Sequence, residues 1–292
     1  MNKIILVTDG SADMPETWQE KYNIMLLPLW LRFKEASYKQ DADMTPGLFY
    51  ELVDKFKEIP KTAFPSPDQM AAFYRSISQK GDHVLSLHVA SKLSGTFDAV
   101  QQAAQNLLAD IDIHPVDSGA GSAALAFMCR DVRILEQAGL SIQRIKRHLD
   151  QVSKKLKIVF TVDNLEYARL SGRVNLLQST LSSLLRLKPV IELRDGLLGV
   201  VEKVRTRQRA FIWLLEYARK NTATANFSVA VVHANDQPAA EHMKRMLESL
   251  ENVKEIVISE LAIPVAAHFG PGTVGLVLYP ELSLDEYRGT KE

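Results

Sequence analysis

HVLSLHVASKLSGTFDAV, residues 83–100, is the stretch that decides the fold class of this chain. Residues 83–89 form a short apolar run typical of a buried strand, and a helical pattern begins at Thr96. One face of that helix, which we expect to pack against a sheet, carries Phe97, Val100, Ala104, Leu107, Leu108 and Ile111. A strand that leads through a short turn into a helix is the unit from which parallel sheets are built.

The same alternation of strand and helix extends over the first half of the chain. Further strands are predicted at residues 3–8, 23–33 and 111–116, and helices at 15–22, 45–59, 68–79, 121–137 and 141–155. Because strands and helices alternate, we predict a parallel sheet with helices on both faces. This first domain is expected to span residues 1–153.

The pattern changes in the second half. Strands are predicted at 157–162, 228–233, 255–261 and 273–279, and helices at 165–170, 176–185, 206–221 and 236–250. Between them, residues 190–193 and 198–204 form a predicted hairpin around the turn signal Asp195-Gly196. A hairpin among helices indicates a mixed or antiparallel sheet, so residues 154–292 are predicted to form a second α/β domain.

Composition excludes several functional classes. The chain has 292 residues, with 35 basic and 35 acidic side chains, so no net charge attracts nucleic acid. Its single cysteine, Cys129, cannot form an internal disulfide and is predicted to be a buried core thiol. The chain starts with a strand pattern rather than a signal peptide, and its apolar runs are too short to cross a bilayer. We therefore expect a soluble cytoplasmic protein.

Small hydroxyl residues and glycines collect in four loops. These are TDGSAD at 8–13, TAFPSP at 62–67, SKLSGT at 91–96 and DSGAGS at 117–122. Any one of them is explained by helix capping. Four on one predicted sheet edge indicate a binding crevice, because ligands of parallel α/β sheets lie beyond the carboxyl ends of the strands. Hydroxyls and backbone N–H groups at a helix N-terminus suit an anion.

Other chemistries find weaker support. The sequence has no phosphate loop, and GAGSAA at 119–124 is better explained by close packing of helix and strand than by dinucleotide binding. No G-x-S-x-G motif is present, although Ser94 with His268 as base and Asp9 as orienting group stays open as a hydrolase alternative. The seven histidines show no paired ligand spacing, so we predict no metal site. His83, His148 and His242 are predicted at the surface or at strand edges.

Two basic side chains, His268 and Arg173, lie in apolar stretches of the sequence. His268 lies in IPVAAHFGPGT, residues 263–273, a predicted loop in which it needs either a backbone carbonyl or a bound ligand as partner. Arg173 lies in LSGRVN, residues 170–175, a predicted turn between helical segments. Its guanidinium group either caps a helix at the surface or binds a carboxylate through two parallel hydrogen bonds.

Taken in order, eight blocks of this sequence resemble the DegV family of bacterial proteins. The blocks are TDGSAD (8–13), TAFPS (62–66), LSGT (93–96), DS (117–118), GRV (172–174), LKPV (187–190), KVRT (203–206) and HFGPG (268–272). The match runs from about residue 3 to about residue 280, and eight ordered blocks are far more specific than any single one. The resemblance implies two α/β domains with one long-chain fatty acid bound between them.

The resemblance also implies partners and a role. DegV proteins are fatty-acid-binding subunits that present the acyl carboxylate to a separate ATP-dependent fatty acid kinase, and the acyl phosphate serves phospholipid synthesis. We accordingly expect a carrier rather than an enzyme, with no cofactor, and transient contact with a membrane through an apolar patch. A serine-dependent acyl hydrolase and a small-molecule phosphotransferase subunit are the alternatives.

Carried over by motif, the carboxylate would be held by the residues Thr62, Ser94, Gly95, Thr96, Arg173 and His268. Secondary candidates are Asp9, Ser11, Ser118, Phe269 and Gly270. Gly10 and Ala63 stand where the family usually has serine, so the set of hydrogen bonds around the head group is expected to be either smaller or completed by water. The predicted helices 176–185 and 121–135 are candidate tunnel walls.

Overall fold

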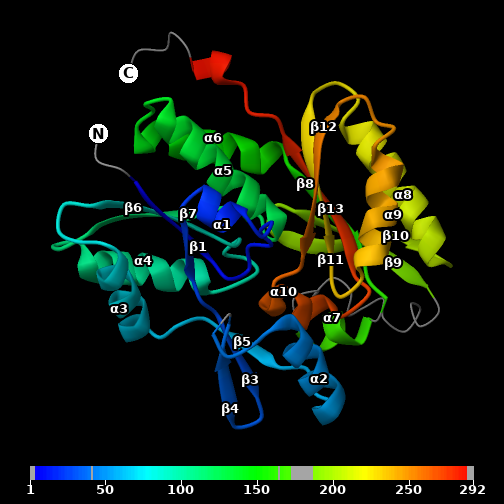
Figure 1. The fold of residues 1–292 in the computed structure, drawn as a ribbon, viewed down its shortest axis with the longest axis horizontal. Coiled ribbons are helices and arrows are strands. Elements are labelled where there is room, and N and C mark those ends of the chain that lie inside the picture. The colour runs from blue at the N-terminus through cyan, green and yellow to red at the C-terminus, as the bar shows by residue number, and fades with distance from the viewer. Residues whose placement is uncertain (1–3, 41, 164, 172–186, 288–292) are drawn as a thin grey trace.

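The computed structural model describes residues 4–40, 42–163, 165–171 and 187–287 (Figure 1). Arg173 and the predicted helix 176–185 lie outside these ranges. Within them, no helix combines the length and the apolar character that crossing a bilayer requires.

The first sheet is parallel, as the sequence predicted. Its order is β2-β1-β6-β7, formed by β1 (Ile5–Asp9), β2 (Ile24–Leu27), β6 (His83–His88) and β7 (Asp112–Asp117). Side chains of successive strand residues point to opposite faces. Val7 and Val84 pack under α3 (Pro67–Ile77) and α4 (Thr96–Leu107), while Leu6 and Leu85 pack under α5 (Ala123–Gln137).

Two details of this half differ from the prediction. The single strand expected at 23–33 is wrong, because β2 ends at Leu27 and β3 (Trp30–Phe33) belongs to another sheet. Pro28 stands at the break and cannot donate a ladder hydrogen bond. Leu108, predicted on the buried face of α4, is 71% exposed because the helix ends one residue earlier.

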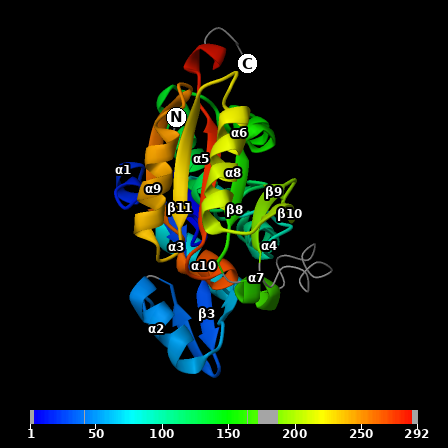
Figure 2. The same ribbon diagram turned by 90° about the vertical axis from the view of Figure 1, so that its right-hand side faces the viewer.

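The strand β3 and two strands that sequence analysis did not predict form a small projecting unit. β3 pairs antiparallel with β4 (Ala36–Lys39) and with β5 (Lys61–Ala63). The helix α2 (Pro46–Phe56), capped by the Thr45 side chain, lies beside them. Figures 1 and 2 show this unit below the two larger sheets, next to the short helices α7 (Leu165–Ser171) and α10 (Ile263–Phe269).

The second sheet is mixed, as predicted, with the order β10-β9-β8-β13-β11-β12. Its strands are β8 (Lys157–Thr161), β9 (Lys188–Arg194), β10 (Leu197–Val204), β11 (Phe227–His233), β12 (Val253–Glu260) and β13 (Val274–Pro280). The β9–β10 hairpin turns through Asp195 and Gly196 at φ 52° and 72°, as a two-residue turn with both central residues left-handed requires. The helices α8 (Arg207–Asn221) and α9 (Gln237–Leu247) cover one face.

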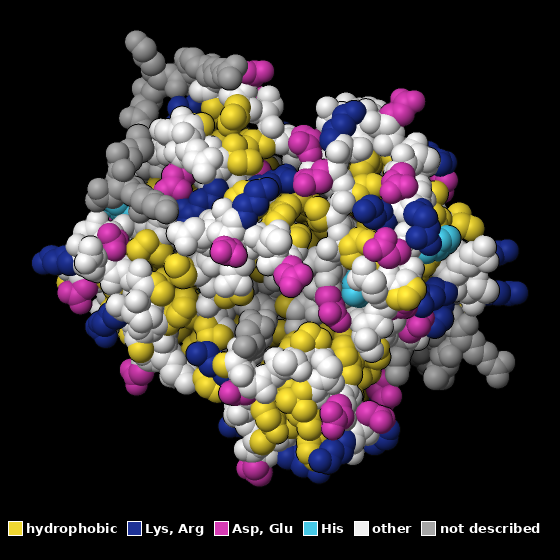
Figure 3. All heavy atoms as spheres, viewed as in Figure 1, with side chains coloured by type: hydrophobic (Ala, Val, Ile, Leu, Met, Phe, Trp, Pro, Cys, Tyr) yellow, Lys and Arg dark blue, Asp and Glu magenta, His cyan; other side chains and the backbone are white. Residues whose placement is uncertain are grey.

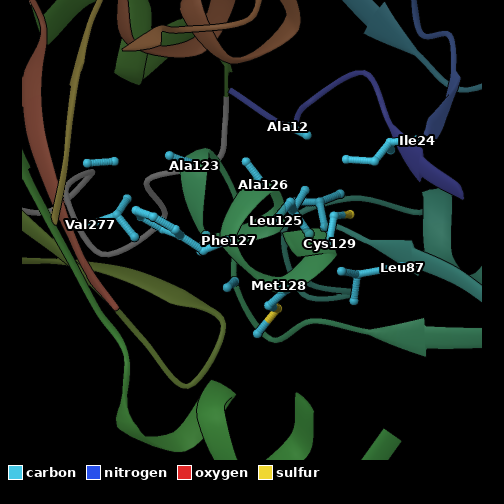
Figure 4. Close-up of a cluster of buried hydrophobic side chains, with 14 of the residues drawn as sticks. Ala12, Ile24, Leu87, Ala123, Leu125, Ala126, Phe127, Met128, Cys129 and Val277 are labelled. Carbon is cyan, nitrogen blue, oxygen red and sulfur yellow. The ribbon is translucent and has the colours of Figure 1, made fainter. Parts of the chain in front are cut away.

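The helix α5 joins the two sheets into one core. It contacts β1 and β6 on one side and β13 on the other, and the Phe127 ring stacks on Tyr279 at 5.0 Å between centroids. Figure 4 shows side chains of both halves around this helix, with Cys129 fully buried among them as predicted. The domain boundary between residues 153 and 154 stays a prediction; it falls in the last turn of α6 (Ile142–Lys155).

His148 on α6 is not at the surface, contrary to the prediction. It is 5% exposed, and its Nε2 lies 2.8 Å from Asp131 Oδ2 and its Nδ1 2.7 Å from the Tyr287 hydroxyl. The Tyr279 hydroxyl donates to the same Asp131 oxygen. The helical period of α6 placed this histidine on the inner face, where partners remote in sequence satisfy it.

Elsewhere, acidic and basic side chains are interspersed over the surface shown in Figure 3.

Candidate functional site

An apolar cavity of about 120 Å³ lies between the carboxyl end of the parallel sheet and the second sheet. Its apolar lining includes Val89, Leu93, Phe160, Leu193, Val232 and Phe269. Val89 and Leu93 follow β6, whereas the others come from the second half of the chain. The crevice predicted at the strand ends is therefore present, and the second sheet covers it.

Three of the predicted head-group residues line this cavity. They are Thr62 on β5, Ser94 in the turn before α4 and His268 on α10. Thr62 Oγ1 lies 3.2 Å from His268 Nε2, although the two residues are 206 positions apart. Folding thus brings together two groups that only the family resemblance had placed in one site.

His268 stands on a helix, so the prediction of a loop at 263–273 is wrong. The helix α10 begins with Pro264 in its first turn, where a missing N–H costs nothing, and ends at Gly270. Gly270 adopts φ 78°, and a Cβ there would lie 2.6 Å from the Tyr167 ring. The glycine therefore both ends the helix and lets α7 pack closely against it, which fixes the position of His268. Gly270 itself does not line the cavity.

The turn before α4 offers one hydroxyl to the cavity. Ser94 Oγ lies 2.8 Å from Thr96 Oγ1 and accepts a hydrogen bond from the Thr96 backbone N–H at 3.3 Å. Thr96 is fully buried and is not part of the lining. Gly95 lies under Phe64, whose ring would be 3.0 Å from a Cβ at that position. Thr96 and Gly95 therefore shape the turn, and Ser94 faces the cavity.

A second, more open groove begins at the polar end of the cavity. It has a volume of about 920 Å³, runs between α2 and α7, and includes Tyr50, Lys57 and Tyr167 in its lining. Thr62 and His268 line both the cavity and this groove. Thr62 and His268 therefore lie where the apolar cavity meets the second groove.

The secondary candidates separate into two groups. Ser11 and Phe269 line the cavity. Ser118 does not; its hydroxyl accepts from the Ala120 backbone N–H at 3.0 Å and so caps its own turn. Arg173 lies outside the described residues, so its role stays a prediction.

Asp9 is part of a buried hydrogen-bond network and therefore cannot orient His268. Its carboxylate accepts from the Val89 backbone N–H at 3.0 Å and from Ser11, and lies 3.1 Å from His88 Nδ1. Burial alone would raise the pKa of Asp9, but hydrogen bonding to His88 holds it below the usual range. The hydrolase arrangement of Ser94, His268 and Asp9 is therefore not assembled.

Ser86, His88 and Asp9 in this network are nevertheless linked in the same order as the Ser-His-Asp triad of a hydrolase. His88 Nε2 lies 2.7 Å from Ser86 Oγ, which lies 2.8 Å from the Tyr74 hydroxyl. Ser86, His88 and Asp9 are each 0% exposed, so no substrate can reach the serine. We interpret the network as a satisfied polar core beneath the loops that form the site.

Sequence analysis missed the pair Asp13 and Ser122. Ser122 lines the cavity, adopts φ 60° and donates its hydroxyl proton to Asp13, whose other oxygen accepts from the Ala262 backbone N–H at 2.6 Å. Burial raises the pKa of Asp13 to about 7, although both hydrogen bonds oppose the rise. The loops at 8–13 and 117–122 were a signal for Asp13 and Ser122, but nothing in the local sequence marks Ala262 as a partner of Asp13.

Comparisons with known proteins give one family. Residues 3–281 match the family model described as "Uncharacterised protein, DegV family". A protein named "Fatty acid-binding protein" from Thermotoga maritima is 29% identical over 279 residues, covering 94% of this chain and 96% of that protein.

Solved structures agree with this result. A DegV family protein from Thermus thermophilus, described by its fatty acid binding, has a TM-score of 0.89 at 29% identity and covers 96% of this chain and 100% of its own. A stearic acid-binding protein from Eubacterium ventriosum has a TM-score of 0.88 at 27% identity, covering 96% of this chain and 98% of its own. The predicted two-sheet α/β fold is thus confirmed.

Proposed function

This chain belongs to the DegV family, and we propose that it binds one long-chain fatty acid in the cavity between its two sheets. The observation that carries the proposal is a mainly apolar cavity whose lining includes three hydrogen-bonding side chains, Thr62, Ser94 and His268. An acyl chain with a carboxylate at one end has the same distribution of polarity. Relatives named for fatty acid binding support the assignment.

The apolar walls supply affinity for the tail. A cavity of 120 Å³ holds on the order of ten water-sized groups at roughly 10–15 Å³ each. About ten buried methylenes at about 0.8 kcal/mol each give roughly 8 kcal/mol before the cost of ordering the chain. A longer tail would need lining side chains such as Leu193 or Phe269 to turn aside.

Hydrogen-bonding side chains in the cavity offset the free-energy cost of burying the carboxylate. An ionised carboxyl group without partners in an apolar space would take up a proton. Hydroxyls of Thr62 and Ser94 and a ring nitrogen of His268 can donate to its two oxygens. Arg173, which lies outside the described residues, remains a proposed fourth partner on the basis of the family motif.

We further propose that the protein presents this carboxylate to a separate ATP-dependent fatty acid kinase and is not itself an enzyme. The open groove that meets the cavity at Thr62 and His268 supports this, because a partner could reach the head group while the tail stays enclosed. Leu170, which lines this groove, and Phe64, two residues after Thr62, are exposed apolar side chains that suit a transient membrane contact.

Denaturing the purified protein and analysing the extract by mass spectrometry is expected to release about one long-chain fatty acid per chain. Val265→Trp, which places a large ring on a half-buried lining position, should lower the amount of lipid several-fold because it fills the space. Ile212→Trp adds the same ring on α8, where Ile212 is 49% exposed, and should leave the amount of bound lipid unchanged. Equal lipid content in both variants, or an extract without fatty acid, would refute the proposal.

The kinase step is tested separately. With ATP and a fatty acid kinase, the bound fatty acid should be converted to acyl phosphate while ATP becomes ADP. Without the kinase, no ADP should form, since the sequence offers no phosphate loop. If the protein alone hydrolyses ATP or a chromogenic acyl ester, the carrier assignment is wrong and an alternative enzyme class replaces it.

A further inference from the structure

A cluster of metal-ligating side chains lies at the amino-terminal ends of β6 and β7, away from the cavity. His83 Nδ1 is 2.6 Å from Asp112 Oδ2, and His114 Nε2 is 3.0 Å from the same oxygen. The ligand atoms of all three residues lie within 4.8 Å of one another. The lipid site is at the other end of these strands, about 16 Å away at roughly 3.3 Å per residue.

The register of two parallel strands sets this arrangement. His83 lies directly opposite Asp112, and His114 follows Asp112 by two residues, so all three side chains project from the same face. Side chains placed by paired strands vary less in position than side chains on loops, which favours a binding site. Sequence analysis predicted no metal site because it found no paired spacing among the histidines; His83 lies 29 residues from Asp112 and meets it only through strand pairing.

We propose that His83, Asp112 and His114 bind one divalent transition metal ion, with Zn²⁺ as the best match. Two imidazole nitrogens and one carboxylate oxygen are ligands that Zn²⁺ accepts, and three protein ligands leave a position for water. Ligand atoms about 2.1 Å from a tetrahedral ion are about 3.4 Å apart, so the hydrogen-bonded groups need only small side-chain rotations.

Accessibility and placement agree with ion binding. The side chains of His83, His114 and Asp112 are 42%, 21% and 44% exposed, so an ion can enter without unfolding. Within the described part of the first sheet, β7 pairs with β6 alone. A bound ion would therefore tie this edge strand to its single neighbour.

The test uses the full chain without a histidine tag, freed of metal by chelator and dialysed. Titration with ZnCl₂ in a calorimeter is expected to show one ion per chain. His114→Gln and His83→Ala should each weaken binding by more than about tenfold, because even outer partners of metal ligands contribute about that much. Cobalt should bind at the same stoichiometry and give an absorption spectrum that is weaker in His114→Gln at the same cobalt concentration.

His242→Ala is the matched control, since His242 is exposed on α9 and lies outside the cluster. It should bind Zn²⁺ as the unchanged protein does. The lipid content of every variant should be unaltered, which separates this site from the fatty acid site. Absence of saturable binding, or equal affinity in His114→Gln, would overturn the proposal.

Discussion

Replacing His268 with alanine is expected to lower the affinity for a long-chain fatty acid by about ten- to a hundredfold. Hydrogen bonds to a charged group contribute about 1.5–3 kcal/mol, and each 1.4 kcal/mol is a factor of ten. The imidazole lies 3.2 Å from Thr62 at the cavity's polar end, so its loss removes one donor to the carboxylate and one contact that orients the threonine. Titration with a fluorescent or isotopically labelled fatty acid, after removal of bound lipid, measures the change.

A fatty alcohol of the same chain length separates head-group effects from tail effects. The alcohol lacks the negative charge but buries the same methylenes, so His268→Ala should change its affinity by less than about threefold. Equal losses for the acid and the alcohol would mean that the substitution deforms the walls instead. His242→Ala, on the exposed side of α9, is expected to alter neither affinity.

Coupling to Thr62 provides a further check. Thr62→Val keeps the shape of the side chain and removes its hydroxyl. Because Thr62 and His268 contact each other, the double variant should lose less binding free energy than the sum of the two single losses. Strict additivity would show that the two side chains act on the ligand independently, and full affinity in both single variants would remove the head-group assignment.

Periodicity and turn chemistry predicted most of the fold correctly. Strands and helices of the parallel half, and the Asp195-Gly196 hairpin, depend on local sequence and were placed within a few residues. The prediction of one strand at 23–33 was wrong because the apolar run continues through Pro28, where the chain leaves one sheet and enters another. The helix α10 was missed since proline and glycine at its two ends, which are ordinary helix boundary residues, were interpreted as loop signals.

The site was predictable only in part, for a physical reason. Hydroxyl-rich loops at strand ends pointed to the crevice, and family motifs selected Thr62, Ser94 and His268 from many polar residues. Cross-chain pairings have no local signature. Asp13 with Ala262, separated by 249 positions, and His83 with Asp112 became visible only from the register and packing of the folded chain.

Asp13→Asn is expected to change how stability depends on pH. Asp13 is 1% exposed, and burial raises its pKa from 3.8 to about 7, so the folded state holds a proton that the unfolded chain releases above pH 3.8. The stabilisation by this proton is complete below pH 3.8 and is lost as pH rises to about 7. A shift of about three pKa units corresponds to about 4 kcal/mol, of which about 3 kcal/mol falls between pH 5 and pH 8.

Asparagine reproduces the neutral form of this side chain. Its oxygen can accept from the Ala262 backbone N–H while its NH₂ group donates to Ser122, but it does not titrate. Relative to Asp13→Asn, the unchanged protein should therefore become less stable by about 3 kcal/mol from pH 5 to pH 8, measured by urea unfolding.

Glu16→Gln is the matched control for this experiment, because it removes an exposed carboxylate three residues away. Its stability should run parallel to that of the unchanged protein across the pH range. Taking the difference between variants cancels groups such as Asp9, whose lowered pKa acts in the opposite direction. If the curves of the unchanged protein and Asp13→Asn also run parallel, Asp13 titrates normally in the folded state, and its hydrogen bonds to Ser122 and Ala262 stabilise the ionised form as fully as water does.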